Sequence, residues 1–237
     1  MWLKSGKKDL LMTCYMKRLY TTDLDDQETK ERMKVFEPIT NLVELKKNVY
    51  LIAMCENMLI YDIRNRIKIG KNYREHRVRK NYNLIEVNYI KEKSILLTGG
   101  CDGLLVLWKV CFRDKLDPEK IEAIDEEIPS IFLTKIQKVK FNSSEGNYCR
   151  IFSIIYLPFP NQIFVSNETD KIYVFSLQKK EPKNTDLIDS VEVLNASYII
   201  RNFPYKIAGM YYLEYYDKFT AFHWKQKNLN FIEIEQD

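Results

Sequence analysis

The chain has 237 residues, of which 46% are hydrophobic and 30% are charged, and it contains only seven Gly and seven Pro. This composition excludes collagen-like, low-complexity and strongly charged disordered proteins, and it predicts a folded chain with one large core or two smaller ones. The formal net charge of +4 is too small to indicate a nucleic-acid-binding protein by itself, so the distribution of charge is more informative than its total.

The N-terminal segment, residues 1–38, differs from the rest of the chain. Its apolar run 10–15 predicts a strand that closes a sheet, and the acidic stretch 23–31 predicts a charged loop or helix. Residues 39–237 form the main predicted domain, because short apolar runs recur along all of this part.

Groups of three short strands recur along the main domain. Runs rich in Ile, Val, Leu, Tyr and Phe alternate with clusters of Asp, Asn, Gly and Lys, which is typical of strands joined by turns. The predicted strands are residues 39–45, 49–54 and 58–63, then 83–90, 94–99 and 104–110, then 150–157, 162–166 and 171–177, and finally 207–214, 218–224 and 229–234. Residues 131–141 are expected to add a fourth strand to the second group. The groups repeat about every 45 to 70 residues, as propeller blades do.

The second group of strands carries the most specific pattern. His76 precedes its first strand, Thr98 lies on its second, Asp102 follows in the turn and Trp108 lies on its third. This pattern resembles a blade of the WD-repeat β-propeller family. The resemblance implies that the four side chains form a buried, hydrogen-bonded network with a structural role.

The third group keeps part of the same pattern. Ser166 and Asp170 have the same four-residue spacing as Thr98 and Asp102, and Phe175 is expected where the Trp would be. The resemblance therefore implies that Ser166 and Asp170 belong to a second, less complete network.

The resemblance implies an all-β fold, a WD-repeat-like β-propeller with four to five recognisable blades. This number is below the seven blades of a typical family member, and an incomplete ring leaves sheet edges and sheet faces open. The chain is therefore a diverged small propeller, a fragment of a longer one, or part of a propeller that a partner completes.

Few residues suit catalysis, metal binding or cofactor binding. The chain has two histidines, His76 and His223, and five cysteines without a C-x-x-C pair. The glycines of 99–103 join two predicted strands and lack the spacing of a phosphate-binding loop. We therefore expect no catalytic residues, no metal site and no cofactor, and we predict that the protein is not an enzyme.

A basic cluster lies between the first and second groups of strands. Eight cations fall within residues 64–80: Arg64, Arg66, Lys68, Lys71, Arg74, Arg77, Arg79 and Lys80. One interpretation is a solvated outer strand, protected by its charge against edge pairing. The other is contact with a polyanion or an acidic partner, which gives the alternative function of an RNA- or ribonucleoprotein-associated binding module.

Aromatic residues are dense near the C-terminus. Tyr212, Tyr216 and Trp224 lie on or beside the last predicted strands, and aromatic residues are enriched in subunit interfaces. We therefore expect these three residues to contact another subunit in a hetero-oligomer. The leading hypothesis is a non-catalytic protein-interaction scaffold within a multi-protein assembly. No apolar run reaches the roughly 18 residues of a membrane-spanning helix, so the protein is expected to be intracellular, cytoplasmic or nuclear.

Overall fold

The computed structural model describes most of the chain. The described residues are 2–5, 8–23, 25, 27–76, 84–116, 129–142, 149–169, 171–180, 191–200, 209–213, 218–225 and 228–234. Within these ranges, only the backbone is described for residues 2–10, 84–85, 191 and 211–234.

The described residues form five antiparallel sheets, and the predicted all-β fold is confirmed. Every sheet is a meander in which consecutive strands of the chain are neighbours. The first sheet contains β1 (Trp2–Ser5), β2 (Lys8–Tyr15), β3 (Arg18–Asp23) and β4 (Thr29–Lys34). The second contains β5 (Ile39–Lys46), β6 (Val49–Met54), β7 (Met58–Asp62) and β8 (Ile67–Tyr73). The third contains β9 (Leu84–Ile90), β10 (Ile95–Gly100), β11 (Leu104–Phe112) and β12 (Ile131–Lys140).

The fourth and fifth sheets continue the same order. The fourth contains β13 (Ile151–Leu157), β14 (Gln162–Asn167), β15 (Ile172–Lys180) and β16 (Val191–Ile200). The fifth contains β17 (Gly209–Leu213), β18 (Lys218–Lys225) and β19 (Asn228–Ile234). The described residues include no α-helix, and the short 3-10 turns η1 (Lys91–Lys93) and η2 (Arg113–Lys115) flank strands of the third sheet.

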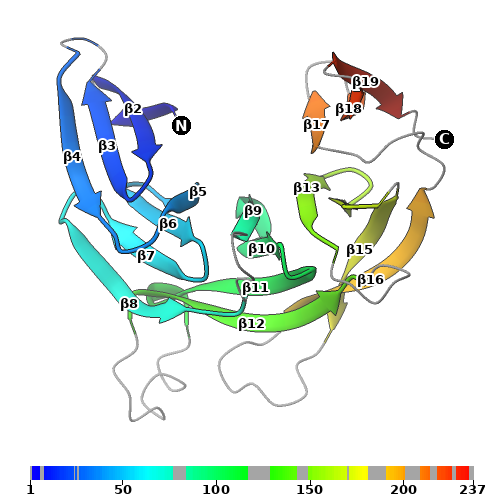
Figure 1. Cartoon of the computed structure of the whole chain (residues 1–237). Helices are drawn as coiled ribbons and strands as arrows, with labels where there is room; N and C mark the ends of the chain where they lie inside the picture. The colour runs from blue at the N-terminus through cyan, green and yellow to red at the C-terminus, as the bar shows by residue number, and fades with distance from the viewer. Residues whose placement is uncertain are drawn as a thin grey trace.

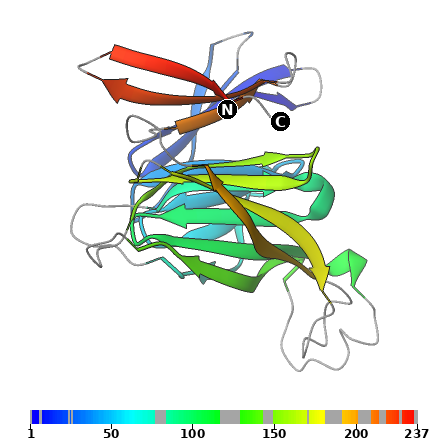
Figure 2. The same cartoon turned by 90° about the vertical axis from the view of Figure 1, so that its right-hand side faces the viewer.

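The five sheets follow one another along an arc. Figure 1 shows the first and fifth sheets at the two ends of this arc, with the third sheet in the middle. The first strands of neighbouring sheets contact one another, β5 with β9, β9 with β13, and β13 with β17. After a quarter turn, the second, third and fourth sheets are seen as stacked layers (Figure 2).

An apolar cluster fills each interface between consecutive sheets. The first and second sheets pack through residues such as Leu19 and Ile52, and the second and third through Ile60 and Leu96. Two further clusters join the third sheet to the fourth and the fourth to the fifth. Full burial of one such aliphatic side chain contributes roughly 2 kcal/mol, so stacking of sheets is the main source of stability.

The N-terminal segment differs from its prediction. It forms four strands of a sheet, whereas one closing strand followed by a charged loop or helix was expected. The turn between β2 and β3 explains the difference, because it consists of Met16 and Lys17, with Met16 at φ 50°. Turns with positive φ normally contain Gly, Asn or Asp, so this hairpin carries no turn signal in the sequence.

Candidate functional site

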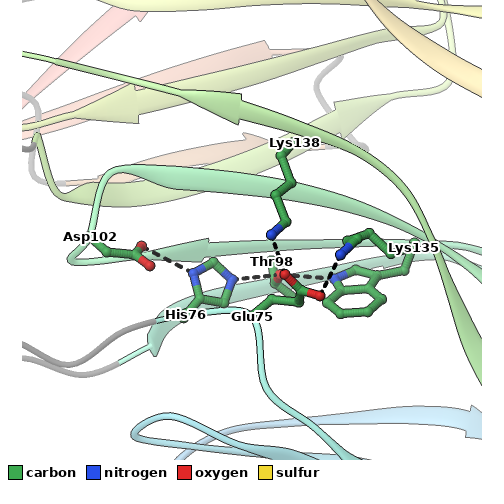
Figure 3. Close-up of polar contacts among 7 residues, drawn as sticks. Glu75, His76, Thr98, Asp102, Lys135 and Lys138 are labelled. Carbon is green, nitrogen blue, oxygen red and sulfur yellow. Dashed lines mark hydrogen bonds and ion pairs between the residues drawn. The ribbon is translucent and has the colours of Figure 1, made fainter.

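Buried hydrogen bonds join four side chains of the third sheet. His76 lies between β8 and β9, Thr98 on β10, Asp102 in the turn after β10, and Trp108 on β11. The imidazole Nε2 of His76 lies 2.9 Å from Thr98 Oγ1, and its Nδ1 lies 3.1 Å from Asp102 Oδ1. The indole N–H of Trp108 donates to Thr98 Oγ1 at 3.0 Å. The structure thus brings together the four residues named from the sequence, and Figure 3 shows Asp102, His76 and Thr98 following one another. We call these four residues the blade network.

The chemistry of each group sets the direction of these bonds. A carboxylate can only accept, so Nδ1 of His76 carries the proton that is shared with Asp102. Thr98 Oγ1 accepts from the indole of Trp108 and also contacts Nε2 of His76, so one hydroxyl serves both rings. His76 and Trp108 are each 3% exposed, so these bonds are shielded from water.

A tight turn holds Asp102 in place. Its Oδ1 also accepts a hydrogen bond from the backbone N–H of Leu104, and Gly103 has φ 71°, which favours glycine. A Cβ added at Gly100 would lie 2.5 Å from Asp102 Oδ1 and 2.6 Å from His76 Nδ1. Glycine at position 100 therefore gives the imidazole and the carboxylate the room to meet.

Glu75, the residue before His76, forms ion pairs with β12, the outer strand of the third sheet. One carboxylate oxygen accepts a bond from Lys135 at 2.6 Å, and the other pairs with Lys138 (Figure 3). Burial acts to raise the pKa of Glu75, but the bonds and charges of the two lysines outweigh it and leave this pKa below its usual value. Sequence analysis missed this contact.

A bulge in β12 explains how both lysines reach Glu75. Residues three apart in a regular strand face opposite sides of a sheet. The register between β11 and β12 shifts at Ile136, because Trp108 pairs with Lys135 and Leu107 pairs with Gln137. The extra residue brings Lys135 and Lys138 to the same side.

The blade network is not repeated among the described residues of the fourth sheet. Ser166 is fully buried on β14, but its hydroxyl has no hydrogen-bond partner in that part of the chain. Asn167 beside it accepts bonds from the backbone N–H and the hydroxyl of Thr169. The predicted partner Asp170 lies outside the described residues.

The fourth sheet presents Ser166 and Phe175 to opposite sides. In the third sheet, Thr98 pairs with Val106, and Trp108 lies two residues later, on the face that packs against the preceding second sheet. Phe175 likewise packs against the preceding third sheet, so it lies on the face that corresponds to that of Trp108. Ser166 pairs with Ile172, which packs against the fifth sheet, so Ser166 faces the opposite way from Thr98.

The basic cluster lies partly on an outer strand. Arg64 and Arg66 lie in the turn before β8, Lys68 and Lys71 lie on β8, and all four are exposed. No ion pair joins these four to any described residue, whereas the neighbouring Arg74 pairs with Glu56. The other predicted cations lie outside the described residues: Arg77, Arg79 and Lys80.

The predicted interface aromatics are only partly described. Tyr212 lies on β17 opposite Phe219, and Trp224 lies on β18 opposite Leu229, with the backbone alone described. Tyr216 lies outside the described residues. The hypothesis that these residues contact a partner therefore stays a prediction.

A partly buried carboxyl lies on the inner strand of the third sheet. Glu86 on β9 pairs in register with Gly99 of β10, and burial raises the pKa of its carboxyl to about 7. No described residue forms a hydrogen bond or ion pair with it. A strand residue of this kind gave no distinguishing signal in the sequence.

Other kinds of site were sought among the described residues. No three His, Cys, Asp or Glu residues in these ranges lie together in a group that could hold a metal ion. Nor does any helix in the described part have the length and apolar character needed to cross a membrane. No family model matches the chain, and no curated protein matches it significantly in sequence. A proposal about function therefore has to be based on the geometry of the blade network and of the sheet edges.

Proposed function

We propose that the chain is a WD-repeat-like β-propeller, open or completed by a partner, that serves as a non-catalytic interaction scaffold in a multi-protein assembly. The observation that carries the proposal is the use of His76, whose two ring nitrogens are both bound within the blade network. A histidine held in this way braces a sheet and has no free nitrogen for proton transfer with a substrate.

The arrangement of the sheets supports the same proposal. Consecutive four-stranded meanders that touch through their first strands are the organisation of propeller blades. The arc has free ends and exposed outer strands, and such surfaces suit contacts with other proteins.

Purification of the tagged full chain from its native cells, after nuclease treatment, tests the assembly role. We expect at least one other protein to co-purify in stoichiometric amount and to be identified by mass spectrometry. Recovery of the chain alone, as a folded monomer, would contradict the assembly role.

The exposed cations of β8 favour a second candidate function, RNA binding. Lys68 and Lys71 form no ion pair with the described residues and can neutralise phosphates, and such binding weakens steeply with salt. A Lys68→Glu, Lys71→Glu variant should then lose salt-sensitive affinity for single-stranded RNA. A Lys17→Glu, Lys34→Glu variant, changed at two exposed lysines of the first sheet, is the matched control. Equal RNA binding by both variants would remove this candidate.

A further inference from the structure

The fifth sheet has apolar residues on both of its faces, and the fourth sheet packs against one of them. Met210 of β17 lies in the apolar cluster with Leu157 and Phe164 of the fourth sheet, which identifies the face toward that sheet. Residues that pair in register in an antiparallel sheet share a face, and alternate residues of one strand lie on opposite faces. The register of β17, β18 and β19 runs without a bulge, so it assigns each paired residue to one face.

We call the other face of the fifth sheet the terminal face. It carries six large apolar residues: Tyr211, Leu213, Phe222, Trp224, Leu229 and Phe231. The fourth sheet carries the same number on its face toward the fifth sheet: Ile155, Leu157, Phe164, Ile172, Val174 and Ile200. The terminal face is thus composed like a face that packs on another sheet. No described sheet follows the fifth one, which stands at one end of the arc (Figure 1).

The first sheet of another copy does not suit the terminal face. Its outer face carries the ion pair of Arg18 with Glu31, and Lys34 pairs in register with Arg18. Stacking of this face on the terminal face would take these charges out of water and set them against Phe222 and Trp224. Desolvation of charged groups opposes such a contact, so a head-to-tail stack of copies is unfavourable.

The terminal face is complementary to itself. Its residues form four rows across the strands: Trp224 with Leu229, then Gly209 with Phe222 and Phe231, then Tyr211 with Thr220 and Glu233, and finally Leu213 with Lys218. Consider a two-fold axis that runs across the strands, between the second and third rows. It sets the second row of one copy against the third row of the other, and the first row against the fourth.

This arrangement sets bulky residues against small or flexible ones. Tyr211 of one copy would meet Gly209 of the other, and Phe222 would meet Thr220. Lys218 would meet Trp224, and a lysine ammonium group is attracted to the face of an indole ring. The two-fold axis makes every contact occur twice, and no contact sets like charges together. The pattern of the rows therefore selects a second copy as the partner.

We propose that the terminal face binds the terminal face of a second copy of this chain in this two-fold arrangement. Burial of about 100 Å² for each of the six apolar residues removes ~1,200 Å² from water over the two copies. This area lies at the lower limit of specific protein interfaces, so a reversible dimer is expected. The pairing uses neither the blade network nor the outer strands, and it does not depend on the scaffold role proposed above.

Sedimentation equilibrium of the purified full chain, from low to high micromolar concentration, tests the pairing. The unchanged chain is expected to form a dimer and no larger species. Thr220→Arg would set an arginine against Phe222 at two symmetric positions near the axis, and it should weaken the dimer by at least about tenfold. The matched control is Thr13→Arg, the same change at an exposed threonine on the outer face of the first sheet, and it should leave the dimer unchanged. Circular dichroism checks that both variants are folded.

Fluorescence quenching gives a second measurement that leaves the terminal face unchanged. The chain has three tryptophans, and Trp108 is buried, so a Trp2→Phe variant makes Trp224 the one that responds to acrylamide. Quenching of Trp224 should fall as the concentration of this variant rises. A chain that stays monomeric overturns the proposal, as does an assembly larger than a dimer or equal dimerisation of the Thr220→Arg and Thr13→Arg variants. A dimer whose formation leaves the quenching of Trp224 unchanged also overturns it.

Discussion

Replacement of Thr98 by valine tests whether the blade network stabilises the third sheet. The hydroxyl of Thr98 is the one group that contacts both the indole N–H of Trp108 and Nε2 of His76. Valine has nearly the same shape as threonine, so Thr98→Val removes the hydroxyl without opening a cavity. Both contacting nitrogens are then left buried and without this partner.

The expected loss of stability follows from the burial of those nitrogens. Trp108 and His76 are each 3% exposed, so water cannot replace the lost bonds without a local opening of the sheet. An unsatisfied buried polar group costs about 1–3 kcal/mol, and two such groups are left, so Thr98→Val should lower the free energy of unfolding by roughly 2–6 kcal/mol. This is a large share of the ~5–15 kcal/mol typical of a folded domain.

Thr98→Ser is the matched control, because it keeps the hydroxyl and removes one buried methyl group. It should lower the free energy of unfolding by about 1 kcal/mol. Urea-induced unfolding, followed by circular dichroism and by tryptophan fluorescence, measures both variants. If Thr98→Val were no less stable than Thr98→Ser, the hydrogen bonds would contribute nothing beyond packing, and the structural role assigned to the blade network would be refuted.

Three further changes probe the third sheet. The lowered pKa of Glu75 means that its bonds to Lys135 and Lys138 stabilise the fold above the unfolded pKa and are lost as pH falls through the folded pKa. Glu75→Gln should therefore be less stable at neutral pH, by about 1 kcal/mol, with the difference vanishing in acid in pH-dependent urea unfolding. The pKa of Glu86 is raised to about 7, so this carboxyl affects stability in the opposite direction. As the pH rises, the folded state retains a proton that the unfolded chain has already released, and the folded state becomes less stable. Glu86→Gln should be more stable than the unchanged chain above pH 7, by about 2 kcal/mol, and this gain should disappear as the pH is lowered toward 4.5 in thermal unfolding. Gly100→Ala would push apart the carboxylate and the imidazole of the blade network, so its midpoint in urea should fall by the equivalent of about 3 kcal/mol, and an unchanged midpoint would contradict this.

The sequence predicts a strand well where alternation and turn chemistry agree. The predicted strands 94–99 and 104–110 correspond to β10 and β11, which are joined by a turn that contains Asp102 and Gly103. The hairpin of β2 and β3 was missed because Met16 takes the positive φ that a glycine normally supplies. β16 was missed for another reason, since its exposed half has no apolar alternation.

The blade network could be predicted because its members come from one short stretch of chain with a known pattern. The contact of Glu75 with Lys135 and Lys138 could not, because it joins residues 60 positions apart and depends on the bulge at Ile136. The sequence of this strand contains no local pattern that predicts the bulge, because its length and its apolar residues are those of an ordinary strand. Contacts that depend on register between distant strands therefore need the structure.

The two faces of the first sheet bear on where a partner can join the arc. One face is apolar and packs through Met12 and Leu19 against the second sheet. The other face is mixed. It carries the ion pair of Arg18 with Glu31 and the hydrogen bond between the hydroxyls of Thr22 and Thr29. The register of β2 with β3 places Leu11 and Tyr15 on this same face, opposite Thr22 and Arg18, and Tyr15 is 66% exposed. A sheet that ends a stack in water needs a polar outer face, and an exposed tyrosine beside charged residues is instead typical of a surface that contacts another protein. The outer face of the first sheet is therefore one place where a partner can join the arc.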